Sequence, residues 1–261
     1  MRLLSRTDFN RHINTGRITD LDALSCWVKP TGEFCLLRME DGVSCIYNGN
    51  STFYEDELSE ELTRCGILGP VIIHHKNNRR EIARWLSRSL ISRNLDDYKD
   101  EIVVYTFRDI PDAALDCRLE LVKIHRHQTS LDKIDKELTV AGDDDSFDGL
   151  IVSPTKAIEM GTMYHLLPKR TVVGKIVSVF GVRDENNRIN AQAAGLIIRV
   201  HFRGKDYYER ITNIPYWVKD RGYKQCVKEL IGCSAQIEYT MFIPGDRLKN
   251  FSSAIVKKIE M

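Results

Sequence analysis

From residue 26 to residue 48 the chain reads CWVKPTGEFCLLRMEDGVSCIYN. Short apolar runs alternate in it with turn residues, Pro-Thr-Gly at residues 30–32 and Glu-Asp-Gly at residues 40–42. Apolar runs of this length between Gly, Pro and Asp residues are typical of strands joined by tight turns. This stretch therefore predicts three strands that form an antiparallel meander.

The residues that follow mix strand and helix patterns. Apolar, β-branched runs recur at residues 102–107 and 149–152, and a helical pattern lies between them, after residue 112. Together with the meander, these elements predict an α+β domain of antiparallel sheets and helices over residues 1–170.

One further helix is predicted over residues 79–93. Asn78 can cap it, and its apolar residues fall on one face. We interpret its arginines as a solvated face, with a phosphate-binding row as the alternative. They are Arg79, Arg80, Arg84, Arg88 and Arg93.

Residues 171–261 have a different sequence pattern, in which short β-type segments alternate with turn residues. Five such segments suit a five-stranded oligonucleotide-binding (OB) β-barrel, with a generic small β-barrel as the alternative. The predicted strands cover residues 172–180, 196–202, 207–211, 235–242 and 254–259.

The net charge of +1 hides an asymmetry between these two parts. Residues 171–261 hold 15 Lys and Arg against 9 Asp and Glu, a net charge of +6, which leaves residues 1–170 at −5. A basic module beside an acidic one is typical of a surface that lies against a phosphate backbone. An ordinary solvated surface is the alternative.

The composition is that of a globular protein. Hydrophobic residues make up 43% and charged residues 29%, and no apolar stretch is long enough to span a bilayer. Charged and polar residues follow Met1 where a signal peptide requires an apolar run. We therefore expect a soluble, cytoplasmic protein with no membrane association, and we expect a monomer.

The seven cysteines form no CxxC pair and their number is odd, which predicts reduced, mostly structural thiols. Two histidine pairs, at residues 74–75 and at residues 125 and 127, are the other metal-ligand candidates. Neither pair has a Cys or His partner at the spacing of a zinc site, so a zinc site is not predicted.

Three short motifs occur in a set order. The chain has KPTG at residues 29–32, VVYTFRD at residues 103–109 and FDGLIV at residues 147–152, followed by the predicted barrel. Their order and spacing resemble the covalent nucleotidyltransferases, which comprise ATP-dependent DNA ligases, RNA ligases and mRNA capping enzymes. The resemblance covers nearly the whole chain. Small DNA ligases are the most similar, because residues 230–239 and 252–259 look like the closing segments of their barrels.

The resemblance implies a chemistry in steps. A lysine amine attacks the α-phosphorus of ATP and forms lysyl-AMP, with release of pyrophosphate. The AMP then activates a 5′-phosphate, which the neighbouring 3′-hydroxyl displaces. Lys29 is the predicted nucleophile, since Trp27 and Val28 precede it in an apolar strand and burial favours the neutral amine that attacks.

The resemblance also assigns nucleotide and metal ligands. Asp148 stands in the place of the family's metal-binding glutamate, so it is predicted to bind Mg²⁺ and the nucleotide. Gly32 permits a close turn beneath the nucleotide, and Lys169 lies near the position of a phosphate-binding lysine. Phe107 is predicted to stack on the base, with an inward core aromatic as the alternative. ATP and Mg²⁺ are the predicted cofactors.

Several family positions hold other residues here. Thr31 replaces an aspartate and Pro70 stands where a glutamate is expected, while His165 and Leu167 occupy the places of two lysines. Each lost charge can slow phosphoryl transfer about a hundredfold, because charge stabilisation is most of what such a site provides. We therefore hypothesise that catalysis is strongly weakened or absent.

Three functions follow from the resemblance. The first is an ATP-dependent DNA ligase-like protein that acts on nicked duplex DNA in repair or replication. The second is a catalytically degenerate protein of the same fold that binds DNA or joins a protein complex. The third is an RNA ligase or capping-type enzyme. In each case the basic barrel is predicted to contact nucleic acid through Lys175, Arg183, Arg188, Arg199, Arg203 and Lys205.

Overall fold

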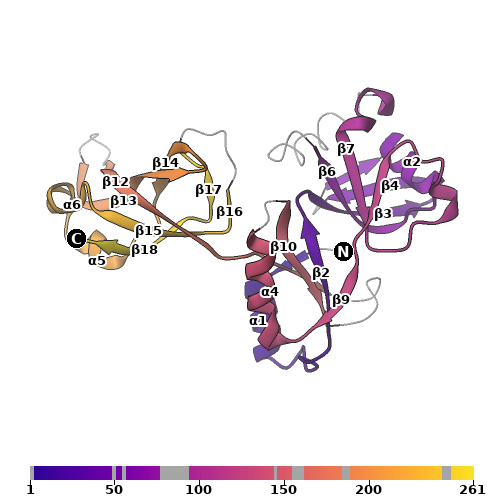
Figure 1. Cartoon of the computed structure of the whole chain (residues 1–261), viewed down its shortest axis with the longest axis horizontal. Coiled ribbons are helices and arrows are strands. Elements are labelled where there is room, and N and C mark those ends of the chain that lie inside the picture. Colours follow the sequence, from indigo (N-terminus) through magenta and orange to yellow (C-terminus); the bar gives the residue numbers. More distant parts are fainter. Residues whose placement is uncertain are drawn as a thin grey trace. The chain divides into compact units, whose positions relative to one another are not determined.

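The computed structural model shows two compact units (Figure 1). They are Met1–Pro168 and Lys169–Met261, so the division falls two residues before the predicted boundary. The helix predicted over residues 79–93, with its five arginines, lies outside the residues that the structure describes. The described residues are 3–48, 51–54, 57–76, 94–143, 146–154, 162–183, 189–242 and 248–261.

The first unit contains two sheets. The first sheet contains, in spatial order, β1 (Leu3–Ser5), β11 (Met163–Leu166), β10 (Phe147–Ser153), β2 (Leu24–Pro30) and β9 (Arg126–Thr129). The second sheet contains β5 (Ser51–Tyr54), β4 (Val43–Asn48), β3 (Glu33–Glu40), β6 (Gly69–His75), β7 (Ile102–Thr106) and β8 (Glu120–Lys123). Neighbouring strands are antiparallel, except that β1 is parallel to β11 and β7 is parallel to β8.

The stretch from residue 26 to residue 48 forms the three predicted strands, but they do not form one meander. β3 and β4 pair as a hairpin, whereas β2 belongs to the first sheet and β3 to the second. The chain crosses between the sheets at Thr31 and Gly32. Gly32 has a φ of 143°, and a Cβ there would lie 2.7 Å from the carbonyl oxygen of Ile73. The crossing therefore requires glycine at this position.

Helices lie along both sheets. In Figure 1, α1 (Arg6–Asn14) and α4 (Leu131–Asp143) accompany the first sheet, and α2 (Glu57–Arg64) accompanies the second. The helical pattern predicted after residue 112 corresponds to a single 3-10 turn, η4 (Asp112–Ala114), and α4 begins only later in the chain. Two further 3-10 turns are η2 (Leu95–Asp97) and η3 (Lys99–Glu101).

Local sequence accounts for the start of α1. The Ser5 side chain accepts a hydrogen bond from the Asp8 backbone N–H, and the Asp8 carboxylate accepts one from the Ser5 backbone N–H. This reciprocal capping box satisfies two donors that a helix start otherwise leaves unpaired.

β2 is buried on both faces. Cys26 packs with residues of α1 and α4 in one core, whereas Trp27 packs with Ile72 and Ile151, from the two different sheets, in another. Because side chains alternate along a strand, Lys29 lies on the same face of β2 as Trp27. The predicted nucleophile therefore faces the interior between the sheets.

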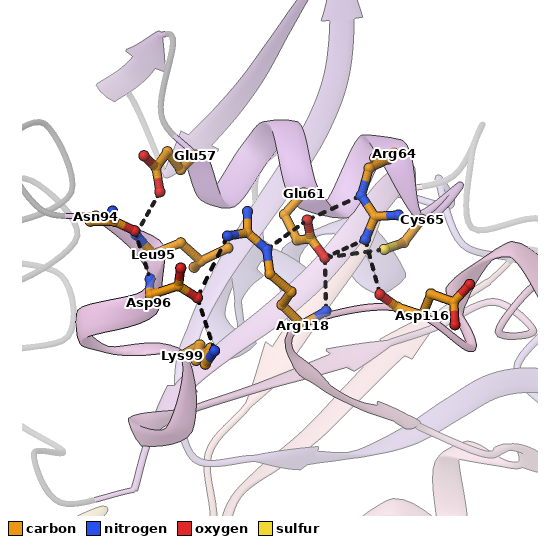
Figure 2. A network of polar contacts seen from close by, with 10 residues as sticks. All are labelled: Glu57, Glu61, Arg64, Cys65, Asn94, Leu95, Asp96, Lys99, Asp116 and Arg118. Atoms are coloured by element: carbon orange, nitrogen blue, oxygen red, sulfur yellow. Dashed lines mark hydrogen bonds and ion pairs between the residues drawn. The ribbon is translucent and has the colours of Figure 1, made fainter.

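A buried carboxylate joins α2 to the segment after residue 94. Glu61, whose side chain is 2% exposed, accepts hydrogen bonds from the Arg64 guanidinium at 2.7 Å and from the Arg118 backbone N–H at 2.8 Å. Figure 2 shows Glu61 between the side chains of these two arginines, and Arg118 also lies 3.6 Å from Asp96. The Glu61 network therefore holds residues 94–118 against the helix.

The second unit is built on one antiparallel sheet, the barrel sheet. Its strands are, in spatial order, β14 (Lys205–Ile211), β13 (Ile189–Phe202), β12 (Arg170–Arg183), β15 (Ser234–Tyr239) and β18 (Ile255–Glu260). Two helices, α5 (Tyr216–Asp220) and α6 (Tyr223–Leu230), follow β14 in the chain. A short pair, β16 (Met241–Phe242) with β17 (Phe251–Ser252), precedes β18.

All five predicted strands are present, but the described residues do not form a closed barrel. The edge strands β14 and β18 share no ladder, and the Val256 N–H donates instead to the carbonyl of Asn213, just beyond β14, at 3.0 Å. β12 and β13 are longer than predicted, at 14 residues each. Their extension includes polar residues such as Asn190 and Gln192, which show no apolar alternation. A partly open barrel is typical of the OB fold.

None of the helices within the described ranges is long and apolar enough to cross a bilayer.

Candidate functional site

Lys29 lies near the end of β2 with its side chain 4% exposed. Its Nζ donates to the carbonyl of Gly32 at 2.8 Å, to the carboxylate of Asp148 at 3.0 Å and to the carbonyl of Pro30 at 3.2 Å. Three acceptors match the three N–H groups of an ammonium. The site therefore fixes the orientation of the Lys29 amine at the point where the chain crosses between the sheets.

Asp148 reaches Lys29 because β10 has a bulge. Phe147 pairs with Pro30 and Gly149 pairs with Lys29, so Asp148 is the extra residue between them. Gly149 has a φ of 126°, and a Cβ there would lie 2.2 Å from the carbonyl oxygen of Leu166. The Phe-Asp-Gly sequence thus builds the bulge, because only glycine fits its third position.

Two of the residues that depart from the family's pattern, Thr31 and His165, also lie at this site. Thr31 donates its backbone N–H to the carbonyl of Ser146 at 2.9 Å, and its hydroxyl lies 3.1 Å from His74 Nδ1. Where the resemblance leads one to expect a carboxylate, the chain therefore presents a hydroxyl beside an imidazole. Thr31 supplies no charge to a metal ion or a phosphate.

His165 on β11 lies beside Lys29 and Asp148. Its Nε2 is 3.3 Å from the backbone carbonyl oxygen of Asp148. Burial, assisted by the positive charge of Lys29 and opposed by Asp148, lowers the pKa of His165 to about 4. The imidazole is therefore neutral at physiological pH and does not replace the positive charge of the lysine that the resemblance implies.

Phe107 is 6% exposed and belongs to the core between the sheets. Its ring centroid lies 5.9 Å from that of Trp27 and 6.1 Å from that of Phe34, both at steep interplanar angles. Phe107 therefore packs as an inward core aromatic, which is the alternative to base stacking that the sequence leaves open. A base could stack on Phe107 only if one of these neighbours moved, so base stacking stays a prediction.

The residues near Lys29 fit a nucleotide and a divalent cation. Trp27 Nε1 is a buried donor with no hydrogen-bond acceptor among the described residues, and a buried donor left unpaired costs about 1–3 kcal/mol. An acceptor on a bound base would satisfy it. Asp148 offers the hard oxygen ligand that Mg²⁺ prefers, provided that it releases Lys29.

Lys169 and the six predicted nucleic-acid residues belong to the second unit. The Lys169 ammonium lies 3.8 Å from the Glu238 carboxylate. Lys175 on β12 is the register partner of Arg199 on β13, which is in turn the partner of Tyr208 on β14. Partners in register share a face of an antiparallel sheet. The structure therefore brings Lys175 and Arg199 together on the outer face of the sheet.

The other predicted contacts do not continue this row. Arg203 and Gly204 form a two-residue turn with φ of 51° and 75°, and the Arg203 guanidinium lies 5.1 Å from the ring centroid of Phe202. Lys205 is the register partner of Phe202, which places it on the opposite face from Arg199. The Arg183 side chain and the whole of Arg188 lie outside the described structure.

Two aromatic residues and an arginine on the outer face escape the sequence prediction. Tyr208 is 44% exposed, and the Arg210 guanidinium lies 4.3 Å from the ring centroid of Phe180. Period-2 alternation over residues 205–211 could have identified Tyr208 and Arg210. We call the face formed by five of these residues the outer basic face: Lys175, Phe180, Arg199, Tyr208 and Arg210.

Comparisons with known proteins give likenesses only at the level of structure. No family model matches the chain, and no curated protein matches it. A solved structure named Pmar-Lig_PreS3 matches with a TM-score of 0.61 at 12% identity, over 98% of this chain and 66% of that one. Another, named Pmar-Lig_Pre, has a TM-score of 0.58 at 11% identity, over 95% and 65%.

A third solved structure comes from a structure–function analysis of Lig E DNA ligases that concerns DNA binding with a minimal scaffold. It has a TM-score of 0.56 at 8% identity and covers 94% of this chain and 96% of that one. This chain spans less than two thirds of the two Pmar-Lig structures. The predicted fold class is confirmed: the chain has the α+β arrangement of the Lig E DNA ligase structure, a unit of two sheets with helices followed by an OB-type sheet.

Proposed function

We propose that this chain is a DNA ligase-like nucleotidyltransferase in which Lys29 accepts AMP from ATP and Asp148 binds Mg²⁺, and that it acts on nicked duplex DNA. The observation that carries the proposal is the buried contact between Lys29 and Asp148 at the crossing between the two sheets. The two residues come from separate motifs, at residues 29–32 and 147–152, and a bulge brings them together.

The Lys29 amine must lose a proton before it can attack phosphorus. The Lys29 ammonium and a divalent cation would compete for Asp148, because both bind the same carboxylate. If Mg²⁺ replaced Lys29 on Asp148, its positive charge would disfavour the ammonium, and the amine proton would pass to solvent. The Lys29 amine would then form the N–P bond as the bond to pyrophosphate breaks, and Mg²⁺ held by Asp148 would offset the charge on the phosphates.

Neighbouring residues make this chemistry slow. His165 is neutral above a pH of about 4, and Thr31 carries no charge. The site therefore relies on Lys29, Asp148 and the cation for most of its charge stabilisation. We expect adenylation to be detectable after long incubation and to require Mg²⁺.

Transfer of labelled AMP tests this function. Incubation with α-labelled ATP and Mg²⁺, followed by denaturing electrophoresis, is expected to label the wild type and Lys258→Ala, which changes an exposed lysine on β18. Lys29→Ala is expected to carry no label. Equal labelling of Lys29→Ala and the wild type would contradict the proposal.

The outer basic face favours a second candidate function, a DNA-binding protein of ligase fold without chemistry. Basic and aromatic side chains alternate there over β12, β13 and β14, in the part of an OB fold that commonly binds oligonucleotides. Such a surface needs neither ATP nor Lys29. DNA binding without any label on Lys29 would support this candidate over the first.

Charge reversal tests whether the outer basic face binds DNA. The double change Lys175→Glu with Arg199→Glu is expected to weaken binding to nicked duplex roughly tenfold or more and to reduce the salt dependence by about two phosphate contacts. The control, Lys224→Glu with Lys228→Glu on α6, makes the same change in net charge at exposed positions. Equal losses in the two double variants would show that only overall charge matters.

A further inference from the structure

Three potential metal ligands from three segments meet where α4 packs on the first sheet. Cys26 on β2 and His127 on β9 are direct register partners, so they point to the same face of the sheet. Glu137 comes from α4. The Cys26 Sγ, a His127 ring nitrogen and a Glu137 carboxylate oxygen all lie within 4.8 Å of one another.

We infer that Cys26, His127 and Glu137 form a binding site for a divalent transition-metal ion of the zinc class. A thiolate, an imidazole and a carboxylate are all ligands that Zn²⁺ accepts, and the thiolate selects against Mg²⁺, which takes oxygen ligands. Binding exchanges the thiol proton of Cys26 for the metal. Thiolate and carboxylate together then balance the two positive charges of the ion.

The geometry requires little movement. A tetrahedral ion with bonds of about 2.0–2.3 Å separates its ligand atoms by roughly 3.3–3.6 Å. His127 Nε2 and Glu137 Oε2 lie 3.0 Å apart, so a small outward shift would admit the ion between them. The ligands are far apart in sequence, which explains why no zinc-type spacing identifies them.

Glu137 is held in place by a residue that would not itself bind the metal. The Thr129 hydroxyl donates to Glu137 Oε1 at 2.5 Å, and Thr129 is 4% exposed. This leaves Oε2 directed at His127. Metal sites typically have such outer hydrogen bonds, which fix the orientation of a ligating carboxylate.

A cavity gives the site access to solvent. Its volume is about 620 Å³, and His127 and Glu137 line it together with Lys133 and Lys136. With three protein ligands, a zinc-class ion keeps a fourth position for an exchangeable ligand. The positive charge of the two lysines favours an anionic ligand there, although the rest of the lining is mostly apolar.

The first unit contains a second cluster of potential metal ligands, which differs from the first in its neighbouring charges. Glu61, Cys65 and Cys117 also lie within 4.8 Å of one another. However, the Glu61 carboxylate already accepts from the guanidinium groups of Arg64 and Arg118. Two positive charges on this carboxylate oppose a cation, so we expect no metal at the second cluster.

Titration of the full-length, reduced and chelator-treated chain with Co²⁺ tests the site. One equivalent is expected to produce the thiolate-to-cobalt charge-transfer absorption, and Zn²⁺ is expected to abolish it by displacement. His127→Gln is the main variant because its side chain is 43% exposed and the change leaves the core intact. It is expected to weaken binding at least about a hundredfold, at or beyond the largest loss that outer hydrogen-bond partners cause.

Matched variants separate the site from nonspecific binding. Cys26→Ser and Glu137→Gln are expected to remove the charge-transfer absorption or weaken it as His127→Gln does, with circular dichroism showing that each is folded. His125→Gln, an exposed neighbour of His127, and Cys117→Ser are expected to leave it unchanged. The inference is overturned if the wild type gives no such absorption, if it survives in folded His127→Gln, or if Cys117→Ser removes it.

Discussion

Lys29→Met is expected to lower the free energy of unfolding by about 3–5 kcal/mol, and Asp148→Asn by a similar amount. The Lys29 and Asp148 side chains are 4% and 10% exposed, and Nζ lies 3.0 Å from Oδ2. Removing either partner leaves the other as a buried charge without compensation, which costs more than the attraction itself contributes. Denaturant unfolding followed by circular dichroism measures the effect.

The double variant shows whether the two side chains act as a pair. Lys29→Met combined with Asp148→Asn removes both charges, so its loss of stability is expected to be smaller than the sum of the two single losses. Lys258→Met is the control, because Lys258 and Glu260 form an ion pair with side chains 66% and 65% exposed, and such pairs contribute little. Additive losses in the double variant would argue against coupling between Lys29 and Asp148.

Glu61→Gln is expected to cost about 3 kcal/mol of stability at neutral pH. Burial alone would raise the pKa of Glu61, but hydrogen bonds from Arg64 and Arg118 outweigh it and lower the pKa from 4.5 to about 2. A shift of this size corresponds to about 3 kcal/mol of stabilisation of the folded state. Figure 2 shows both arginines on this carboxylate, and a neutral glutamine amide would leave them without a negative partner.

The pH dependence of this effect has a definite sign. Because the folded-state pKa is depressed, the stabilisation is fully present above a pH of about 4.5 and is lost as the pH falls towards 2. The difference between wild type and Glu61→Gln should therefore shrink over that window in denaturant titrations. Glu60→Gln, at an exposed position on the same helix, should show no such change. A difference as large at pH 3 as at pH 7 would refute the assignment.

Local patterns predict the strands of this chain well but not their partners. β2 and β3 both follow from apolar runs beside turn residues, yet β2 pairs with β10, more than a hundred residues away in the chain. What separates β2 from β3 is the close approach of Gly32 to Ile73. That contact is set by tertiary structure, so residues 26–48 alone suggest a meander.

In the candidate site, too, the sequence identifies residues but not the contacts between them. Motifs identify Lys29 and Asp148, but their contact depends on a bulge that the alternation pattern of β10 does not show. The predicted nucleic-acid-binding residues do not all share one face of the sheet. The two-residue turn at Arg203 sets the register of β14 and places Lys205 on the face opposite Arg199. The hydrogen bonds of Glu61 also escape prediction, since Arg118 lies far from it in the sequence.

In the proposed reaction, Lys29 is the residue to which AMP is transferred. Mass spectrometry of peptides from the full-length chain, after incubation with ATP and Mg²⁺, identifies the modified residue. We expect the peptide that contains Lys29 to gain the mass of one adenylyl group (AMP less one water), with the modification located on that lysine. AMP on another lysine, or no modified peptide from folded protein after long incubation, would contradict it.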